Sequence, residues 1–133
     1  MDVDSKIKQE FPINNGIIKK HTNGLLHFER DKKIEKSSTE GTKTLFNSIA
    51  NIQGKSKDPM LIDMQGLKEM QMDCRMFLLN KLPDFSTAIA FLIDEDPVTR
   101  SQFNLSNSFR KKTIPIEFFH DEKDARKWLS SHL

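Results

Sequence analysis

The pattern of apolar and polar positions divides the chain into short strands and longer helices. Two segments, 60–64 (MLIDM) and 86–93 (STAIAFLI), are almost continuously apolar, which is typical of strands covered on both faces of a sheet. A third apolar segment, 114–119 (IPIEFF), has a proline near its start, which favours a position at the sheet edge. Nearer the N-terminus, two β-capable segments flank Asn23-Gly24, the strongest short signal for a hairpin.

Signals for a helix start occur at four places along the chain. Ser, Thr and Asp side chains cap helices because their oxygens accept hydrogen bonds from the free N–H groups of the first turn. The predicted N-caps are one of Ser37, Ser38 and Thr39 for the first helix, Asp73 for the second, Asp96 for the third and Asp121 for the fourth. Gly54 is expected to end the first helix.

Apolar residues spaced three or four positions apart identify the helix faces that should pack on the sheet. They are Leu45, Phe46, Ile49 and Ile52 in the first helix, Met76, Phe77 and Leu79 in the second, and Ala125, Trp128 and Leu129 in the fourth. The third helix is expected to bury Val98, Phe103 and Phe109, which are spaced less regularly. Strands that alternate with helices are joined by right-handed crossovers and pair in parallel. The predicted fold class is therefore α/β, with a mixed sheet of about four to six strands, antiparallel at the N-terminal hairpin and parallel in the centre, and about four helices.

The N-terminal region sets the expected domain boundaries. Residues 1–13 form a polar segment that is either frayed or an edge strand with Pro12 in it, and residues 14–133 form one domain. A chain of 133 residues is the size of one ordinary domain. Asn15-Gly16 is a further turn signal, so a three-stranded meander is an alternative to a single hairpin.

Composition narrows the classes of partner and the setting. The 21 basic and 19 acidic residues give a net charge of +2, which favours neither nucleic acid nor an anionic membrane as partner. Cys74 is the single cysteine, which excludes an intrachain disulfide and a cysteine-rich zinc site. No apolar segment approaches the roughly 20 residues of a membrane span, and residues 1–10 carry charges where a signal peptide is apolar. We therefore expect a cytoplasmic protein.

The C-terminal half carries a recognisable arrangement of residues. An A-x-A strand is followed by a helix, by a strand that ends in two aromatic residues before an acidic one, and by a helix with the pattern acidic-x-x-A-x-x-W-L. The matching residues are Ala88, Ala90, Phe118, Phe119, Asp121, Asp124, Ala125, Trp128 and Leu129. This arrangement resembles the STAS-like domains, the superfamily of the anti-sigma-factor antagonists and the SpoIIAA-like proteins, over roughly residues 14–133. It looks most similar to bacterial members with no established activity. The resemblance implies a non-catalytic regulatory or protein-interaction domain.

One feature of the anti-sigma-factor antagonists is missing from this chain. In those proteins, a serine at the helix start that follows the first central strand is phosphorylated by a partner kinase. Such a position suits a switch because the helix N–H groups and dipole favour an incoming phosphate. Here no Ser or Thr lies between Asp63 and Arg75, and the matching positions hold Met72 and Asp73.

The resemblance therefore implies a binding surface without the switch. Its expected residues follow the two central strands and are Gly66, Met72, Asp73, Cys74, Arg75, Asp94 and Asp96. Gly66 permits a tight turn, and the free N–H groups of a helix start can contact an anion or a partner. The expected partner is another protein or a second copy of this chain, with no metal or cofactor.

Two further classes of function stay open. A small-molecule or lipid carrier, by analogy with the SEC14-type fold, would need an apolar cavity between helices and sheet. Its flexible wall would come from the methionine-rich stretch Met60, Met64, Met70, Met72 and Met76. An enzyme is the other class, and it would use Asp63, Cys74 or His120.

Other chemical candidates are better explained by local structure. Asp63, Asp94, Glu95 and Asp96 follow adjacent strands and could together hold Mg²⁺, but a turn and a helix cap account for them more simply. Cys74 is expected to be a small buried residue or an inert surface thiol. His27 alternates with apolar neighbours, which predicts a half-exposed strand histidine.

Overall fold

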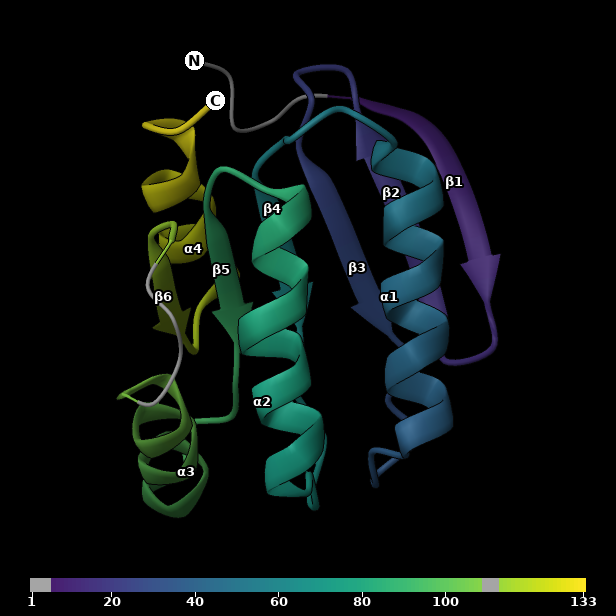
Figure 1. Ribbon diagram of the computed structural model, residues 1–133. Coiled ribbons are helices and arrows are strands. Elements are labelled where there is room, and N and C mark those ends of the chain that lie inside the picture. Colours follow the sequence, from purple (N-terminus) through teal and green to yellow (C-terminus); the bar gives the residue numbers. More distant parts are fainter. Residues whose placement is uncertain (1–5, 109–112) are drawn as a thin grey trace.

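A six-stranded mixed sheet forms the centre of the molecule in a computed structural model, which describes residues 6–108 and 113–133 (Figure 1). The strands are β1 (Ile7–Ile13), β2 (Gly16–His21), β3 (Leu26–Arg30), β4 (Met60–Asp63), β5 (Ile89–Leu92) and β6 (Ile116–Phe119). They lie in the sheet in chain order. The first three form an antiparallel meander, and β3 to β6 pair in parallel. The predicted α/β fold class is thus confirmed.

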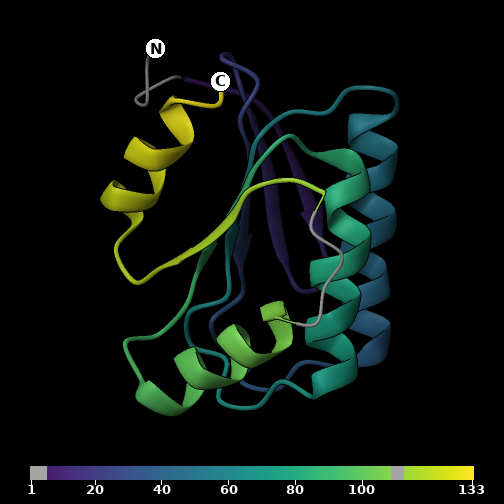
Figure 2. The same cartoon turned by 60° about the vertical axis from the view of Figure 1, so that its left-hand side comes forward.

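Within residues 6–108 and 113–133, four α-helices cover the sheet unequally. They are α1 (Thr39–Gln53), α2 (Met72–Lys81), α3 (Pro97–Ser108) and α4 (Glu122–Ser130), and a short 3-10 helix, η1 (Leu82–Phe85), follows α2. Successive right-handed crossovers in one direction along a sheet place their helices on the same face, so α1, α2 and α3 lie together. Because α4 follows the last strand, it is free of that constraint and packs on the opposite face (Figure 2).

The sheet separates two hydrophobic cores. The larger core lies under α1, α2 and α3 and contains Phe28, Ile49, Ile62, Leu78, Phe91 and Phe103 among others. The smaller lies under α4 and contains Leu25, Leu61, Ala88, Ala90, Leu92, Ala125 and Leu129. Every residue of β4 and β5 is buried, which confirms that these apolar strands are covered on both faces.

Most predicted helix ends are confirmed. The Ser38 hydroxyl accepts a hydrogen bond from the Gly41 N–H at the start of α1, and Gly54 ends that helix with a φ of 56°. Asp121 caps α4 by accepting from the Lys123 N–H. Asp96 accepts from the Val98 N–H and the Thr99 hydroxyl at the start of α3, and these hydrogen bonds lower its pKa.

The prediction that Asp73 caps the second helix is wrong. The N-cap of α2 is Gln71, and Asp73 lies in the first turn. The helical hydrogen bonds begin earlier because the Arg75 N–H donates to the Gln71 carbonyl at 3.1 Å. The Arg75 guanidinium also donates to the Met70 carbonyl, which holds the chain where it enters the helix.

Two helix faces also differ from their prediction. The buried residues of α2 are Cys74, Arg75, Leu78 and Leu79, whereas Met76 and Phe77 are half-buried. The reason is that α2 packs against both α1 and α3, so no single stripe is buried. In α3, Phe103 is buried as expected, but Val98 is 63% exposed, and Phe109 lies outside the described residues.

Proline residues occupy both edges of the sheet. β1 pairs only with β2, which makes residues 7–13 the edge strand that was one of the two alternatives, with Pro12 in it. β6 forms the other edge, and Pro115 directly precedes it, as predicted. Since proline has no N–H to donate, it is tolerated at an edge. The three-stranded meander is confirmed, and the predicted boundary after residue 13 falls in the β1–β2 turn.

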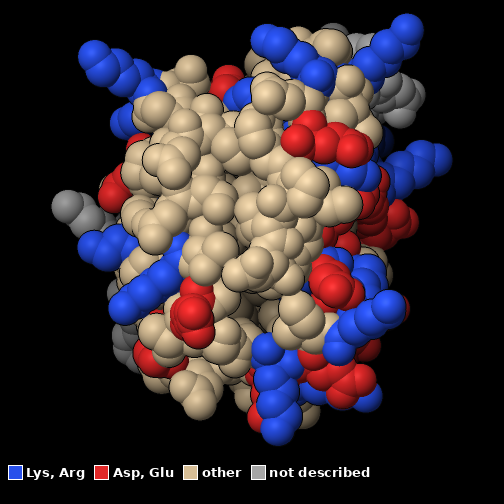
Figure 3. Space-filling view, turned by 90° about the vertical axis from the view of Figure 1, so that its right-hand side faces the viewer, with Lys and Arg blue, Asp and Glu red and all other residues tan. Residues whose placement is uncertain are grey.

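The centre of the side that carries β1 and α1 has little formal charge. Figure 3 shows uncharged residues across its centre, with Lys, Arg, Asp and Glu near the margins. Only Glu40 and Lys43 are charged among the 15 residues of α1.

Among the described residues, no helix has both the length and the apolar composition needed to cross a membrane.

Candidate ligand-binding pocket

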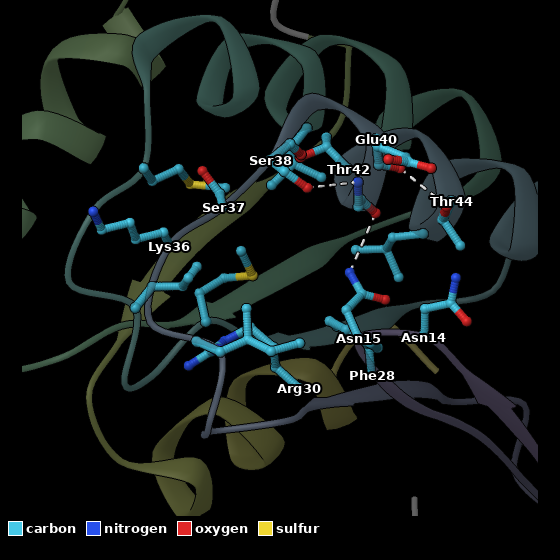
Figure 4. A pocket seen from close by; sticks show the side chains of 17 residues that line it. Asn14, Asn15, Phe28, Arg30, Lys36, Ser37, Ser38, Glu40, Thr42 and Thr44 are labelled. Atoms are coloured by element: carbon cyan, nitrogen blue, oxygen red, sulfur yellow. Dashed lines mark hydrogen bonds between the residues drawn. The ribbon is translucent and has the colours of Figure 1, made fainter.

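A pocket of about 280 Å³ opens beside the N-terminus of α1, and we call it the α1 pocket (Figure 4). Its apolar lining includes Phe28, Leu45, Met64, Leu67, Met70 and Leu78, and its polar lining includes Asn14, Asn15, Arg30, Lys36, Ser37, Ser38, Glu40, Thr42 and Thr44. The residues come from the β1–β2 turn, from the ends of β3 and β4, and from α1 and α2 with the loops before them. Ligands in open α/β sheets gather at the carboxyl ends of the parallel strands, where this pocket lies.

The β1–β2 turn positions the N-terminus of α1 over the pocket. The Asn15 side-chain amide donates to the Gly41 carbonyl at 3.2 Å, and the Gly41 N–H donates to the Ser38 hydroxyl at 2.9 Å. Figure 4 shows both hydrogen bonds at the rim. The sequence separation of Asn15 and Gly41 means that the rim forms only in the folded chain.

Two loops are joined beside the pocket by backbone hydrogen bonds. The Lys68 N–H donates to the Glu35 carbonyl at 2.7 Å, and the Ser37 N–H donates to the Glu69 carbonyl at 2.9 Å. Lys36 pairs with Glu69 and Lys68 with Glu35, at 3.6 and 3.4 Å. These ion pairs are exposed and contribute little, roughly 0–1 kcal/mol each, so the backbone bonds hold the two loops together.

Arg30 is the buried cation of the site. Its side chain is only 6% exposed, and its terminal nitrogens donate to the carbonyls of Asp31, Ile34 and Gln65. Burial lowers the pKa of Arg30, whereas the carboxylates of Asp63 and Asp94 favour its charged form. Arg30 therefore joins the end of β3 to the loop after β4 and brings a positive charge to the wall of the pocket.

Three residues that line the α1 pocket each have a buried polar atom with no hydrogen-bond partner among the described residues. The atoms are Asn15 Oδ1, Arg30 Nε and Ser37 Oγ. A buried donor or acceptor without a partner costs about 1–3 kcal/mol, so such atoms are rare in native proteins. All three atoms belong to residues that line one largely apolar cavity.

The structure brings two of the predicted site residues together next to this pocket. The Gly66 N–H donates to both oxygens of the Asp94 carboxylate, at 3.2 and 3.1 Å. Gly66 has a φ of +87°, and a Cβ there would lie 2.8 Å from an Arg30 nitrogen. Both the conformation and the close approach require glycine. These two residues organise the loops beside the pocket, but neither lines it.

The other predicted residues differ widely in exposure. Met72, Asp73 and Asp96 lie at the surface. Cys74 is buried and lines a smaller cavity of about 140 Å³ between α1 and α2. Arg75 is also buried, and its Nε donates to the Ser106 hydroxyl at 3.0 Å, which connects α2 to α3. Cys74 and Arg75 are therefore packed inside the molecule.

The residues considered for catalysis are engaged in local structure. Asp63 accepts from Lys32 Nζ at 2.8 Å and from the Gln65 N–H at 2.9 Å, which is a strand-end turn. The His120 ring lies 4.0 Å from the Glu95 carboxylate at the surface. In the part of the chain that the structure describes, no three His, Cys, Asp or Glu side chains are grouped so that they could hold a metal ion.

The prediction that His27 is half-exposed is wrong. Instead of being half-exposed, it is 1% exposed, because α4 covers it and Arg126 contacts its Nδ1 at 3.1 Å. Burial, with a further contribution from the charge of Arg126, lowers the pKa of His27 to about 4. The alternation of residues identified its strand, but it could not show that a helix from the other end of the chain lies over it.

Sequence reasoning missed most of the α1 pocket. Of the methionines proposed for a flexible wall, Met64 and Met70 do line it. Asn15 had been considered only for a turn and Ser37 only for a helix cap, and Arg30 had been assigned no role. These residues occur in turns, loops and strand ends of ordinary composition. No local pattern could have identified them, since their shared property is that they surround the same cavity.

Fold and pocket together define a single-domain α/β protein with a ligand-sized cavity at the carboxyl edge of its sheet. A family model described as "Domain of unknown function (DUF7793)" matches residues 19–133, and the chain therefore belongs to this family. The match begins within β2, so β1 and Asn15 precede it. No curated protein shows significant sequence similarity to the chain.

Proposed function

We propose that this DUF7793 protein is a non-catalytic binding domain that takes a small amphiphilic molecule into the α1 pocket. The observation that carries the proposal is a cavity with apolar walls and polar side chains at its rim, at the carboxyl ends of the parallel strands. Small-molecule sites typically combine apolar walls with a few placed polar groups and occupy roughly 300–1,000 Å³. The α1 pocket, at about 280 Å³, suits a ligand at the small end of that range.

A binding role without catalysis is supported by the state of the reactive side chains. Cys74 is buried, and Asp63 is already hydrogen-bonded to Lys32 and to the backbone of its own turn. A catalytic group must reach the reacting atoms of a substrate, and neither residue lines the α1 pocket.

The proposed domain is of the STAS-like type. The C-terminal residue pattern supports this assignment, as does a mixed sheet with parallel central strands. The chain lacks a serine or threonine at the start of α2, where the anti-sigma-factor antagonists carry their phosphorylated serine.

Nuclear magnetic resonance of the methionine methyl groups tests ligand binding directly. The probes are amphiphiles of about ten non-hydrogen atoms that share a chain and differ in their head group (alcohol, amide, amine and carboxylate). We expect at least one probe to shift the methyl signals of Met64 and Met70 saturably. The Met76 signal serves as an internal reference, because Met76 lies outside the pocket lining.

Two matched variants separate the pocket from the rest of the surface. Met70→Trp fills the α1 pocket, whereas Met76→Trp changes a methionine of similar half-buried exposure on the neighbouring helix. Met70→Trp should abolish binding while Met76→Trp keeps it. If no probe binds to the wild type, or if Met70→Trp binds as well as the wild type, the proposed function is wrong.

A second candidate is a protein partner or self-association. Its specific support is that Met72, Val98 and Leu105 are 48%, 63% and 57% exposed. Val98 and Leu105 are two helical turns apart and lie on one face of α3. Light scattering of the wild type and of a Val98→Lys, Leu105→Lys double variant tests self-association. A monomer in both samples at high concentration would rule out a homodimer through this face.

A further inference from the structure

The charge balance and the volume of the α1 pocket define a narrower class of ligand. We infer that the ligand is an uncharged, largely apolar molecule of about nine non-hydrogen atoms, which fills the pocket. This inference rests on the proposed function, because it specifies the molecule that the same pocket takes. Such a ligand is held by apolar contacts, and a single neutral polar group lies at the rim.

The inner wall of the pocket is apolar. Phe28, Leu45 and Leu78 line it, belong to the larger core and are each no more than 2% exposed. Met64 and Leu67, from the segment after β4, are buried beside them. Apolar cavities in proteins exclude water and take up apolar molecules, because removing apolar surface from water is favourable. The part of the ligand that lies against this wall is therefore apolar.

The positive charge of Arg30 is already balanced inside the protein. Its terminal nitrogens donate to three backbone carbonyls. The carboxylates of Asp63, Asp94 and Asp31 also face it and favour its charged form. A ligand anion would add a further negative charge to these three carboxylates. Arg30 therefore holds the loops beside the pocket together and supplies no unbalanced charge to a ligand.

The other charges of the lining are balanced as well. Among the described residues, the charged side chains that line the pocket are those of Arg30, Lys36 and Glu40. Lys36 Nζ lies 3.6 Å from a carboxylate oxygen of Glu69. Glu40 lies in the first turn of α1, where the partial positive charge of the helix N-terminus opposes its negative charge. A charged ligand would therefore lie against apolar walls without a counter-charge, which is costly.

Several polar side chains at the rim are engaged with the backbone of α1. The hydroxyls of Thr42 and Thr44 donate to the carbonyls of Ser38 and Glu40, at 2.9 and 3.0 Å. The side-chain amide of Asn15 donates to a carbonyl in the first turn of the same helix. These hydrogen bonds fix the rim and leave few donors for a ligand. A head group that needs many hydrogen bonds is therefore disfavoured, whereas a single hydroxyl can stay hydrated at the opening.

The volume of the pocket limits the size of the ligand. A water-sized group takes about 30 Å³ in a liquid, so about 280 Å³ holds about nine such groups. 1-Octanol, with eight carbons and one oxygen, is close to this size. Met64 and Met70 are unbranched and flexible, so the walls can adapt to a chain that differs by one or two methylenes.

Isothermal titration with probes of matched size tests the inference. 1-Octanol and octylammonium have the same number of non-hydrogen atoms, and so do 1-nonanol and octanoate. We expect each alcohol to bind at least about tenfold more tightly than its charged counterpart, because only the ion loses strong hydration without gaining a partner. From 1-pentanol to 1-octanol, the affinity should rise about fourfold per methylene. It should level off for 1-dodecanol, since the pocket is then full.

A matched pair of methionines tests whether the charge balance of the pocket sets this preference. Met70 and Met76 are both half-buried, but only Met70 lines the pocket. Met70→Lys adds a positive charge to the wall that no carboxylate of the lining is placed to balance. It should therefore reverse the preference, so that octanoate binds more tightly than 1-nonanol. Met76→Lys should keep the preference of the wild type, and circular dichroism checks that both variants fold.

The possible outcomes separate this inference from the proposed function. If octanoate or octylammonium binds within about tenfold of its size-matched alcohol, or more tightly, the uncharged ligand is wrong while a small-molecule site stays in place. Affinity that still rises from 1-octanol to 1-dodecanol at about fourfold per methylene would overturn the size limit. These wild-type measurements decide the inference even if Met70→Lys fails to fold. Absence of binding by every probe, in titration and in the methyl spectra, would overturn both.

Discussion

His27 lies on β3 under α4, where Arg126 determines which of its ring nitrogens carries the proton. An arginine side chain can only donate, so Nδ1 of His27 accepts at 3.1 Å and the proton is on Nε2. That Nε2 is buried without a partner. The ring also faces His21, Glu29 and Glu122, and burial has the largest effect on its pKa. The folded protein therefore holds this imidazole in the neutral form.

The lowered pKa of His27 predicts a loss of stability in mild acid. Above the unfolded-state pKa of 6.5, His27 is neutral in both the folded and the unfolded chain, so its protonation does not change the free energy of unfolding. As the pH falls from 6.5 towards about 4, the unfolded chain binds a proton that the folded chain does not, so the free energy of unfolding decreases. At pH 4.5, urea unfolding should show that protonation of this residue in the unfolded chain has lowered the free energy of unfolding by roughly 2–3 kcal/mol.

The variant His27→Gln isolates this contribution from that of the carboxylates. It should be less stable than the wild type at pH 8 but should lose roughly 2–3 kcal/mol less between pH 8 and pH 4.5. His120→Gln, which changes a histidine at the surface, should keep the acid dependence of the wild type. If His27→Gln and the wild type lose stability in parallel, His27 is not neutral in the folded protein.

At the scale of elements, the helix starts show how similar residues take different roles. Asp121 and Asp73 both lie near the start of a helix, and each was predicted to be an N-cap. Asp121 accepts from the N–H two residues later, which is a capping hydrogen bond. Asp73 lies two residues after the N-cap Gln71, and its carboxylate accepts from the N–H of the next residue, Cys74. The sequence signal is the same, but the structure places only one of them at the cap.

Alanine substitution should separate these two aspartates. Asp121→Ala should lower the free energy of unfolding by about 1 kcal/mol, because a free N–H of α4 loses its partner. Asp73→Ala should change it by less than about 0.5 kcal/mol, because the better helix propensity of alanine offsets the lost interaction with the helix dipole. Urea unfolding at pH 7 measures both, and equal losses would contradict the assignment of Gln71 as the cap of α2.

At the scale of the whole molecule, the two faces of the sheet are covered by different numbers of helices. α1, α2 and α3 cover one face, but the smaller core on the other depends on α4. Leu129 and Ala125 of α4 are fully buried against β4 and β5, while Trp128 packs beside them. Stability of this face therefore depends on a few side chains of one short helix.

Two leucines on different helices test this dependence. Leu129 is 0% exposed and Leu105 of α3 is 57% exposed. Leu129→Ala should lower the free energy of unfolding by about 2–5 kcal/mol, since it removes buried methyl groups and leaves a cavity. Leu105→Ala should stay within about 0.5 kcal/mol of the wild type. Similar losses in guanidinium unfolding would mean that α3 is covered in solution, which would favour self-association through that helix.

The sequence by itself determined the elements and their order. The apolar segments that became β4 and β5, the Asn23-Gly24 turn and the caps Ser38, Asp96 and Asp121 were all recognisable in the chain. Each of these signals depends on residues a few positions apart, because strand burial, turn geometry and capping are local. The alternation of strands and helices then required crossovers of one hand, which left few arrangements of the sheet.

Only the tertiary structure decided which side chains share a cavity and which are buried by a distant element. Arg126 reaches His27 across 99 positions of sequence, and Arg75 bonds to Ser106 across 31. The α1 pocket likewise joins residues of the β1–β2 turn, β3, α1 and α2. Whether these side chains are buried, and whether their polar atoms find hydrogen-bond partners, depends on how the helices pack on the sheet. Packing of that kind is set by the whole set of contacts, so no segment of the sequence carries it alone.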